Sequence, residues 1–330
     1  MSKIGIEIKV LLITFIISII CAFIIIPALK KLKVGQIERD DGPASHLKKQ
    51  GTPTMGGIIM IIAIIISVII SCIYLSFAGN MDLARRLIPF LLIALGFGMI
   101  GFIDDFKKLV LKNTKGLKPS YKMLGLLLIA TVYILYLTQV LKFGTEINIP
   151  ILKIYVEIPI YIYIPFAILV ILGTTNAVNL TDGVDGLSSS VSCLIITALT
   201  VIGISHGMYE VSIFGSIVIG ATLGFLVFNL HPAKVFMGDT GSLMLGGVIS
   251  GMALYLKLPL LLLLIAIIPV LETVSVIIQV AYFKKTGKRV FKMTPLHHHF
   301  ELSGWNENKI VVIFSLITLI ACFIGLKIME

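Results

Sequence analysis

Long apolar runs separated by short polar segments set the pattern of the chain. About ten of these runs approach or reach the roughly 20 residues that a helix needs to cross the hydrocarbon core of a bilayer. They cover residues 10–29, 56–78, 87–103, 121–141, 160–178, 187–205, 211–229, 241–257, 259–282 and 310–327. The pattern predicts an all-α polytopic membrane protein with about ten transmembrane helices.

One segment between the predicted helices has a different period. Residues 145–158, TEINIPILKIYVEI, alternate and are rich in β-branched side chains, with Pro150 near the middle. Alternation of this kind is typical of strands, and proline fits the turn between them. We therefore expect a short β-hairpin on the outer side of the membrane.

Composition supports a membrane protein. Of the 330 residues, 58% are apolar and only 13% are charged, whereas about a quarter of the residues in a soluble domain are charged. Since no polar stretch is long enough to fold alone, residues 1–330 are expected to form a single integral membrane domain.

The net charge of +10 is distributed unevenly. Most of the 27 Lys and Arg residues fall in or beside the segments that follow the first, third and ninth apolar runs. Because basic residues mark the cytoplasmic side of a membrane protein, these segments are predicted to be cytoplasmic. The segments after the fifth and seventh runs then lie on the same side, and both termini lie outside. The same bias accounts for the positive charge, and no basic and aromatic patch indicates a nucleic-acid partner.

Acidic residues gather on the predicted cytoplasmic face. Those in or beside the cytoplasmic loops are Asp40, Asp41, Asp104, Asp105, Asp182, Asp185 and Asp239. Such convergence suits a hard divalent cation, because Mg²⁺ takes one or two carboxylates together with substrate phosphates.

Each acidic motif also has a structural explanation. In GFIDDFKK, Asp104 and Asp105 could be a solvated helix end beside lysines. Neighbours on a helix point about 100° apart, so one acid is expected to face the site and the other Lys107 and Lys108. In MGDTGS, Asp239 could cap the eighth helix and also lie near a bound anion.

The segment NAVNLTDGVDGLSSS admits two interpretations as well. Gly183 and Gly186 would let the backbone approach a ligand closely. The same residues could form an ordinary loop with Asx turns and a helix cap. No Lys or Arg in the segment neutralises its acids, which favours a functional site.

Two further segments carry candidate chemistry. In DGPASHLKKQGTPTMGG, residues 41–57, Lys48 and Lys49 could anchor the chain at the lipid surface or belong to a shaped loop. In MTPLHHHFELSGW, residues 293–305, three histidines are consecutive. A shared zinc would need an irregular loop, so imidazoles that donate to phosphate or sugar oxygens are favoured.

Glu272 lies inside the ninth apolar run. An ionisable group within the membrane is by default a candidate for function. The alternative is a hydrogen bond to a nearby polar group inside the bundle.

Five motifs occur together in a specific order: SHLKKQGTPTMGG, GFIDDFKK, NAVNLTDGVDG, FNLHPAKVFMGDTGS and PLHHHFE. They resemble the motifs of the phospho-N-acetylmuramoyl-pentapeptide transferases, which belong to the polyprenyl-phosphate N-acetylhexosamine-1-phosphate transferases. The resemblance extends from about residue 40 to about residue 305. Two departures are small, since Val184 stands where leucine is common and Ser303 where lysine is common.

The resemblance implies a Mg²⁺-dependent enzyme of the bacterial cell membrane with a cytoplasmic active site. Such an enzyme transfers phospho-N-acetylmuramoyl-pentapeptide from its UDP donor to undecaprenyl phosphate. The products are lipid I and UMP, in the first membrane step of peptidoglycan synthesis. A homodimer is also expected.

The resemblance also assigns positions in this sequence. The implied catalytic residues are Asp104, Asp105, Asp239, His297 and His298, with Asp239 also the metal ligand. The implied substrate-binding residues are Lys49, Thr54, Asn179, Asp182, Asp185, Asn229, Phe236 and His299. Phe236 would stack on the uracil, and Lys49 and Thr54 would lie near the nucleoside and phosphates.

Other functions remain as alternatives. A transporter would place polar groups near the midplane and often contain inverted repeats, whereas the charges here cluster at one face. A structural scaffold has no use for acids in several loops. A sister transferase that uses UDP-N-acetylglucosamine is the alternative within the enzyme class, and PLHHHFE disfavours it. Direct attack by the lipid phosphate and a covalent aspartyl-phosphate intermediate both remain open.

Overall fold

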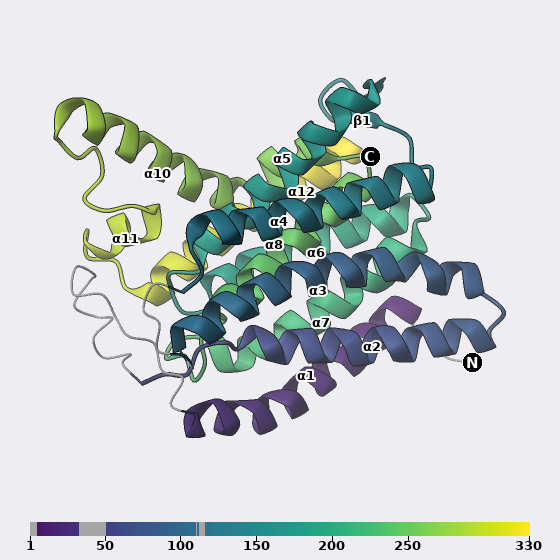
Figure 1. Cartoon of the computed structure of the whole chain (residues 1–330), viewed down its shortest axis with the longest axis horizontal. Helices are drawn as coiled ribbons and strands as arrows, with labels where there is room; N and C mark the ends of the chain where they lie inside the picture. Colours follow the sequence, from purple (N-terminus) through teal and green to yellow (C-terminus); the bar gives the residue numbers. More distant parts are fainter. Residues whose placement is uncertain (1–4, 33–50, 110, 112–115) are drawn as a thin grey trace.

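The computed structural model describes residues 5–32, 51–109, 111 and 116–330 of the chain (Figure 1). Over these residues, long helices lie side by side in a bundle, and the sheet has two strands. The start of α1 and the end of α12 lie toward the end of the bundle opposite α11 (Figure 1). The predicted all-α polytopic class is confirmed.

The helices follow the apolar runs closely. The long ones are α1 (Ile6–Lys31), α2 (Gly57–Phe77), α3 (Met81–Leu109), α4 (Pro119–Leu135, continued by a π-helical segment, Tyr136–Val140), α5 (Ile160–Thr181), α6 (Leu187–Ser205), α7 (Tyr209–Asn229), α8 (Gly238–Tyr255), α10 (Ile267–Thr286) and α12 (Glu307–Met329). The short ones are a 3₁₀ turn (Pro259–Leu261), α9 (Leu262–Ile265) and α11 (Leu296–Glu301).

Among the described residues, nine helices are long and apolar enough to cross a membrane. The helix α8 is the exception among the predicted spans. Every residue from Thr240 to Tyr255 is buried by the surrounding helices. Because protein rather than lipid surrounds this helix, its surface can be less apolar than that of the other nine.

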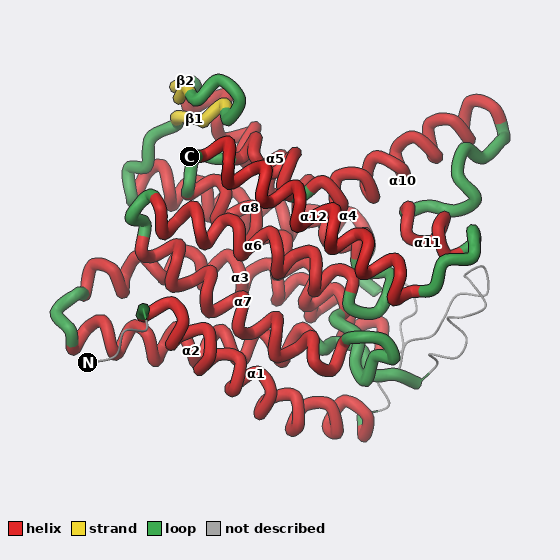
Figure 2. Tube along the Cα trace, turned by 180° about the vertical axis from the view of Figure 1, so that it is seen from behind, coloured by secondary structure: helices red, strands yellow, loops and turns green. Residues whose placement is uncertain are grey.

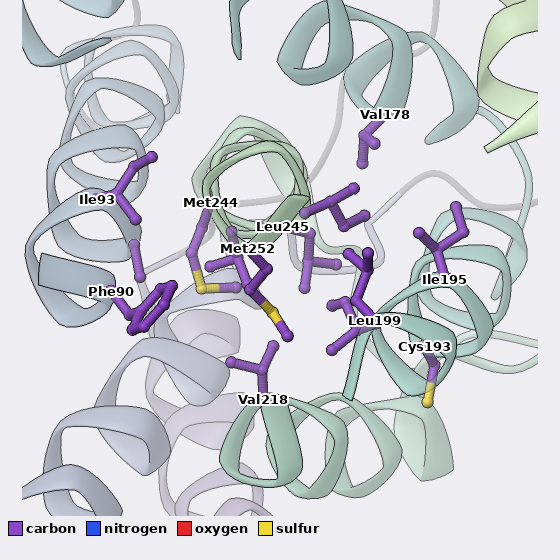
Figure 3. Close-up of a cluster of buried hydrophobic side chains, with 14 of the residues drawn as sticks. Phe90, Ile93, Val178, Cys193, Ile195, Leu199, Val218, Met244, Leu245 and Met252 are labelled. Atoms are coloured by element: carbon purple, nitrogen blue, oxygen red, sulfur yellow. The ribbon is translucent and has the colours of Figure 1, made fainter. Parts of the chain in front are cut away.

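The core is built around α8. Figure 3 shows Met244, Leu245 and Met252 of this helix among side chains from its neighbours. Phe90 comes from α3 and Val218 from α7, and both are fully buried. The position of α8 is therefore fixed by contacts on all sides.

Glycines let the first turn of α8 approach two other helices. A Cβ at Gly57 of α2 would lie 2.2 Å from the backbone nitrogen of Gly241. A Cβ at Gly101 of α3 would lie 2.2 Å from the carbonyl oxygen of Asp239. No side chain fits at such distances, so α2, α3 and α8 meet backbone to backbone, as small residues allow between membrane helices.

The predicted hairpin is present. The strands β1 (Glu146–Ile149) and β2 (Ile154–Glu157) pair antiparallel, and Pro150 lies in the turn between them. The nitrogen of Asn148 donates to the carbonyl of Lys257 at 2.8 Å. The hairpin is thereby attached to the segment that follows α8.

The predicted span 259–282 is divided. The chain forms a 3₁₀ turn and α9, breaks helical geometry at Ala266 (φ −99°, ψ 33°), and continues as α10. Figures 1 and 2 both show α10 leaving the bundle, with α11 beside the loop that returns from it. The apolar run continues across Ala266, so apolar length alone does not reveal this break; the local signal is Pro269, which fits the first turn of α10.

Candidate active site

The acidic motifs meet at one end of the bundle, where α3 and α5 end and α8 begins. The predicted third span ended at residue 103, but α3 continues to Leu109, so Asp104 and Asp105 lie within its last turns. Asp239 is the second residue of α8, and Asp182 follows the last residue of α5.

Two lysines link Asp104 to Asp239. The Nζ of Lys108 lies 2.8 Å from Oδ2 of Asp104 and 3.1 Å from Oδ2 of Asp239. The Nζ of Lys122, in the first turn of α4, lies 2.8 Å from Oδ2 of Asp239 and 3.4 Å from Oδ2 of Asp104. Oδ1 of Asp104 accepts from the backbone nitrogen of Leu117 at 2.7 Å. The two acids and two lysines form one charged cluster.

Asp105 has a different role from its neighbour. Its Oδ2 accepts from the nitrogen of Thr240 at 2.9 Å and from the hydroxyl of Thr240 at 2.7 Å. Its Oδ1 accepts from the nitrogen of Asp239 at 3.2 Å. These donors belong to the first turn of α8, whose backbone N–H groups have no intrahelical partner. Asp105 therefore caps α8 from another helix.

The prediction that one acid of the pair faces the site and the other faces the lysines is only partly correct. The two carboxylates do point at different partners, as their helical spacing requires. However, Asp104 contacts Lys108 and also lies beside Asp239, so one residue combines the two predicted orientations. Asp105 faces a helix terminus, which the sequence did not indicate.

Asn179 orients the remaining oxygen of Asp239. Its Nδ2 donates to Oδ1 of Asp239 at 2.8 Å and lies 2.8 Å from the hydroxyl oxygen of Ser242. The Asp239 carboxylate is thus held by neighbours from α3, α4 and α5. The structure brings Asn179, a predicted substrate-binding residue, into the charged cluster.

The loop after α5 places Asp182 next to this cluster. Burial raises the pKa of the Asp182 carboxyl to about 8, and the charges of Asp239, Asp105 and Asp185 act in the same direction. The raised pKa thus reflects a buried position, and in addition the charges of three nearby acids. A cation or a basic group at this position would lower it.

Asp185 connects the loop after α5 with the segment that follows α7. Its Oδ2 lies 3.0 Å from Nδ1 of His231 and accepts from the nitrogen of Ala233 at 3.0 Å. Nδ1 of His231 is also 3.6 Å from Oε2 of Glu307, at the start of α12. Within the described ranges, these three side chains are the one set of potential metal ligands whose ligand atoms all lie within 4.8 Å of one another. The imidazole itself bridges the two carboxylates.

Two of the predicted nucleotide-site residues, Asn229 and Phe236, lie at the end of α7 and in the segment between α7 and α8. Asn229 is buried, accepts from the hydroxyl of Ser189 at 2.8 Å and donates to the carbonyl of Val235 at 3.0 Å. Phe236 is half-buried, and its backbone pairs with the segment before α2: its nitrogen donates to Pro53 at 2.8 Å and its carbonyl accepts from Gly56 at 2.8 Å.

Thr54 belongs to the same paired segment. It is buried, and a Cβ at Gly238 would lie 3.0 Å from its Oγ1. Thr54 therefore lies beside the start of α8, near Asp239. Lys49 falls outside the described residues.

The three consecutive histidines point at different partners. Nδ1 of His297 lies 3.1 Å from Oε1 of Glu272, and Nδ1 of His298 lies 2.8 Å from Oε2 of Glu301. Nδ1 of His299 accepts from the nitrogen of Lys292 at 3.2 Å. They occupy the helix α11 rather than an irregular loop, which agrees with the argument against a shared zinc. The intramembrane acid Glu272 has a hydrogen-bond partner inside the protein, as the alternative explanation expected.

Sequence reasoning missed several residues of this region, above all Lys122. Basic residues are common at the cytoplasmic end of any span, so nothing in the sequence distinguishes Lys122 from a lipid anchor. His231 and Glu307 were also missed, because each is far in sequence from Asp185. Their contacts depend on how the loops fold together.

Comparison with known proteins agrees with the resemblance of the five motifs. Residues 87–257 match the model of glycosyl transferase family 4. A protein of Acetivibrio thermocellus is 45% identical over 318 residues, which cover 96% of this chain and 93% of that one. A protein of Clostridium novyi is 48% identical over 314 residues, covering 95% and 94%.

A third relative, from Halalkalibacterium halodurans, is 46% identical over 304 residues, which cover 92% of this chain and 91% of that one. All three are named phospho-N-acetylmuramoyl-pentapeptide-transferase. Similarity over nearly the full length of both partners confirms the resemblance inferred from the five motifs. The chain belongs to glycosyl transferase family 4 and, within it, to the phospho-N-acetylmuramoyl-pentapeptide-transferases.

Proposed function

We propose that this protein transfers phospho-N-acetylmuramoyl-pentapeptide from its UDP donor to undecaprenyl phosphate, giving lipid I and UMP. The observation that carries the proposal is the cluster of Asp104, Asp239, Lys108 and Lys122 at the ends of membrane helices. A lipid phosphate lies at headgroup depth, so the groups that act on it must lie at helix ends. Full-length similarity to proteins named for this activity supports the same conclusion.

The site end of the bundle is proposed to face the cytoplasm, with both termini outside. The last turns of α1, α3 and α10 each carry two lysines: Lys30 and Lys31, Lys107 and Lys108, and Lys284 and Lys285. Basic residues beside span ends set orientation by the positive-inside rule. The UDP donor is soluble, so it would reach the site from the cytoplasm.

The reaction joins two anions. An oxygen of the lipid phosphate forms a bond to the phosphorus that carries the sugar. The bond from that phosphorus to the bridging oxygen breaks, and UMP leaves with the electron pair. Lys108 and Lys122 would offset the repulsion, and the first turn of α8 would add its backbone N–H groups.

Mg²⁺ is the proposed cofactor, with Asp239 as its protein ligand. The donor set fits, since Asp239 is oriented by Asn179, lies beside Asp105, and offers the carboxylate oxygens that Mg²⁺ takes. When bound, the cation would neutralise the phosphates and stabilise the charge that develops during transfer. Binding of Mn²⁺, measured by electron paramagnetic resonance, should be lost in Asp239→Asn.

Direct attack by the lipid phosphate is favoured over a covalent intermediate. A covalent mechanism needs a carboxylate oxygen that can reach the donor phosphorus. Asp104 and Asp105 are only 2% and 4% exposed, and all their oxygens accept hydrogen bonds from the protein. Single-turnover release of UMP from the donor without lipid tests this. We expect no burst, and a burst of one UMP per site that disappears in one Asp→Asn variant would establish the covalent route.

The central experiment is a UMP-release assay with purified protein. Release should require Mg²⁺, undecaprenyl phosphate and the peptide-bearing donor together. Preference for UDP-N-acetylglucosamine in a donor competition would identify the sister activity instead. Solute uptake by proteoliposomes without UMP release would indicate a transporter.

A further inference from the structure

Glu272 and His297 form a buried pair inside the protein. Glu272 of α10 is 0% exposed and His297 of α11 is 1% exposed. The backbone nitrogen of His297 lies 3.3 and 3.4 Å from the two oxygens of Glu272, and Nδ1 of the ring lies 3.1 Å from Oε1. One carboxylate therefore fixes both the backbone and the ring of the same residue.

The contact with Glu272 decides which ring nitrogen carries hydrogen. An ionised carboxylate has no hydrogen to donate and can only accept hydrogen bonds. Nδ1 of His297 must therefore donate to Glu272. In the neutral ring the lone pair is then on Nε2. Nδ1 of the neighbouring residue His298 lies 2.8 Å from Oε2 of Glu301.

The other ring nitrogen of His297 faces the loop that carries Asp182. Nε2 is buried and has no hydrogen-bond partner among the described residues. A Cβ at Gly183 would lie 2.1 Å from it. A buried polar atom without a partner is costly, so its retention in a protein calls for an explanation such as a catalytic role.

We propose that Glu272 is a positioning residue, which holds His297 in the Nδ1–H form so that Nε2 can accept a proton from substrate at Gly183. The inference rests on the proposed function. The loop after α5 would shift slightly when substrate binds and uncover Nε2. The proton would come from a singly protonated lipid phosphate, which becomes the attacking dianion. The imidazolium would lie against the Glu272 carboxylate and later return the proton to water.

Other charged groups lie around this pair. On α11 itself, the rings of His297 and His298 are 4.2 Å apart, and Glu301 is the partner of His298. The loop that contacts Nε2 carries Asp182 and Asp185. The acceptor that Nδ1 of His297 faces is Oε1 of Glu272, at 3.1 Å, and this contact sets the tautomer.

A double-mutant cycle tests whether Glu272 acts through His297. The variants are Glu272→Gln, His297→Ala and the double substitution, with UMP release measured at saturating substrates. Glu272→Gln should lower kcat by about 10²-fold, within the 10²–10⁴-fold range of general acid–base catalysis, and leave the donor KM nearly unchanged. The double variant should be no slower than His297→Ala, because the effects of residues that act as a unit are not additive.

Two controls separate positioning from structural support. Glu210→Gln removes a comparably buried acid, 6% exposed, whose partners Tyr255 and Arg86 are outside the site, and kcat should not change. The single tryptophan, Trp305, packs against Phe300 of α11 with the ring centroids 4.6 Å apart. Its fluorescence should be the same in wild type and Glu272→Gln.

Several results would overturn the inference. Losses that multiply in the double variant would show that Glu272 acts independently of His297. A raised donor KM with normal kcat, or an altered Trp305 signal, would assign Glu272 to binding or to folding. The ¹⁵N spectrum of labelled histidines, with His297 identified by its absence in His297→Ala, reports the tautomer without turnover. The Nε2–H form in the wild type would refute the proposal, whereas a wild type that releases no UMP would refute the proposed function.

Discussion

The assignment of Asp105 to the cap of α8 leads to a prediction that separates structure from chemistry. Asp105→Asn preserves the size of the side chain and removes its charge. The amide oxygen can keep the two hydrogen bonds from Thr240. The amide nitrogen then faces the backbone N–H of Asp239, where the carboxylate accepted at 3.2 Å. Two hydrogen-bond donors would then face each other, and this hydrogen bond would be lost.

The expected cost follows from these contacts. One hydrogen bond to a charged group is lost, which costs about 1.5–3 kcal/mol. The interaction of the negative charge with the N-terminus of α8 is lost as well, which costs roughly 0.3–1 kcal/mol. Asp105 is 4% exposed, so water does not compensate for either loss. Together the substitution should destabilise the protein by about 2–4 kcal/mol.

Thermal unfolding in detergent can be followed with a dye that reacts with thiols, because the four cysteines are buried or partly buried. The midpoint should fall in Asp105→Asn. It should not change in Asp82→Asn, a matched control on the same helix whose side chain is 92% exposed. If Asp105→Asn abolished UMP release and left the midpoint unchanged, Asp105 would act in the chemistry and the capping argument would be wrong.

Four further predictions follow from the site. Asp239→Asn should reduce kcat by at least about 10³-fold, since a metal ligand contributes several kcal/mol, and substantial turnover at ordinary Mg²⁺ would remove it from that role. Phe236→Ala should raise the donor KM more than the lipid KM, and equal effects would indicate simple packing. Asp182 binds its proton more tightly folded, with a pKa of about 8, than unfolded, with a pKa near 3.8. The folded state thus holds more protons between these values, and stability in EDTA should fall as pH rises from about 4 to 8, an effect absent in Asp182→Asn. Cysteines introduced at Ala233 and Lys288 should react only with reagents that reach the cytoplasm, and labelling of both from outside would reverse the orientation.

The sequence predicted the elements of the fold better than their ends and contacts. Apolar length identifies a span because the thickness of the lipid core imposes that length. The alternating segment identified the hairpin because the period of a strand is also a local property of the sequence. Apolar length does not identify the break at Ala266, because the apolar run continues across it, and Pro269 in the next turn is its one local sign. The extension of α3 past residue 103 was missed because charged residues were taken to end the helix.

The acidic residues of the site could be predicted from the sequence, but the contacts between its side chains could not. Asp104, Asp105, Asp182 and Asp239 could be found because carboxylates are rare beside membrane spans. The pairing of Glu272 with His297 joins two residues 25 positions apart across the loop that follows α10. No period or motif encodes such a contact, so only the folded chain reveals it.

The burial of α8 has a consequence for how the protein is made. The insertion machinery admits a segment to the bilayer according to its own apolarity, and α8 contains five glycines and Asp239. It is therefore a poor candidate to enter lipid by itself. The helices that enclose it, α2, α3, α5 and α6, are synthesised earlier and can receive it as it emerges. Enlarging Gly57 or Gly101, which contact its first turn, should therefore reduce the amount of inserted protein before any effect on catalysis can be measured.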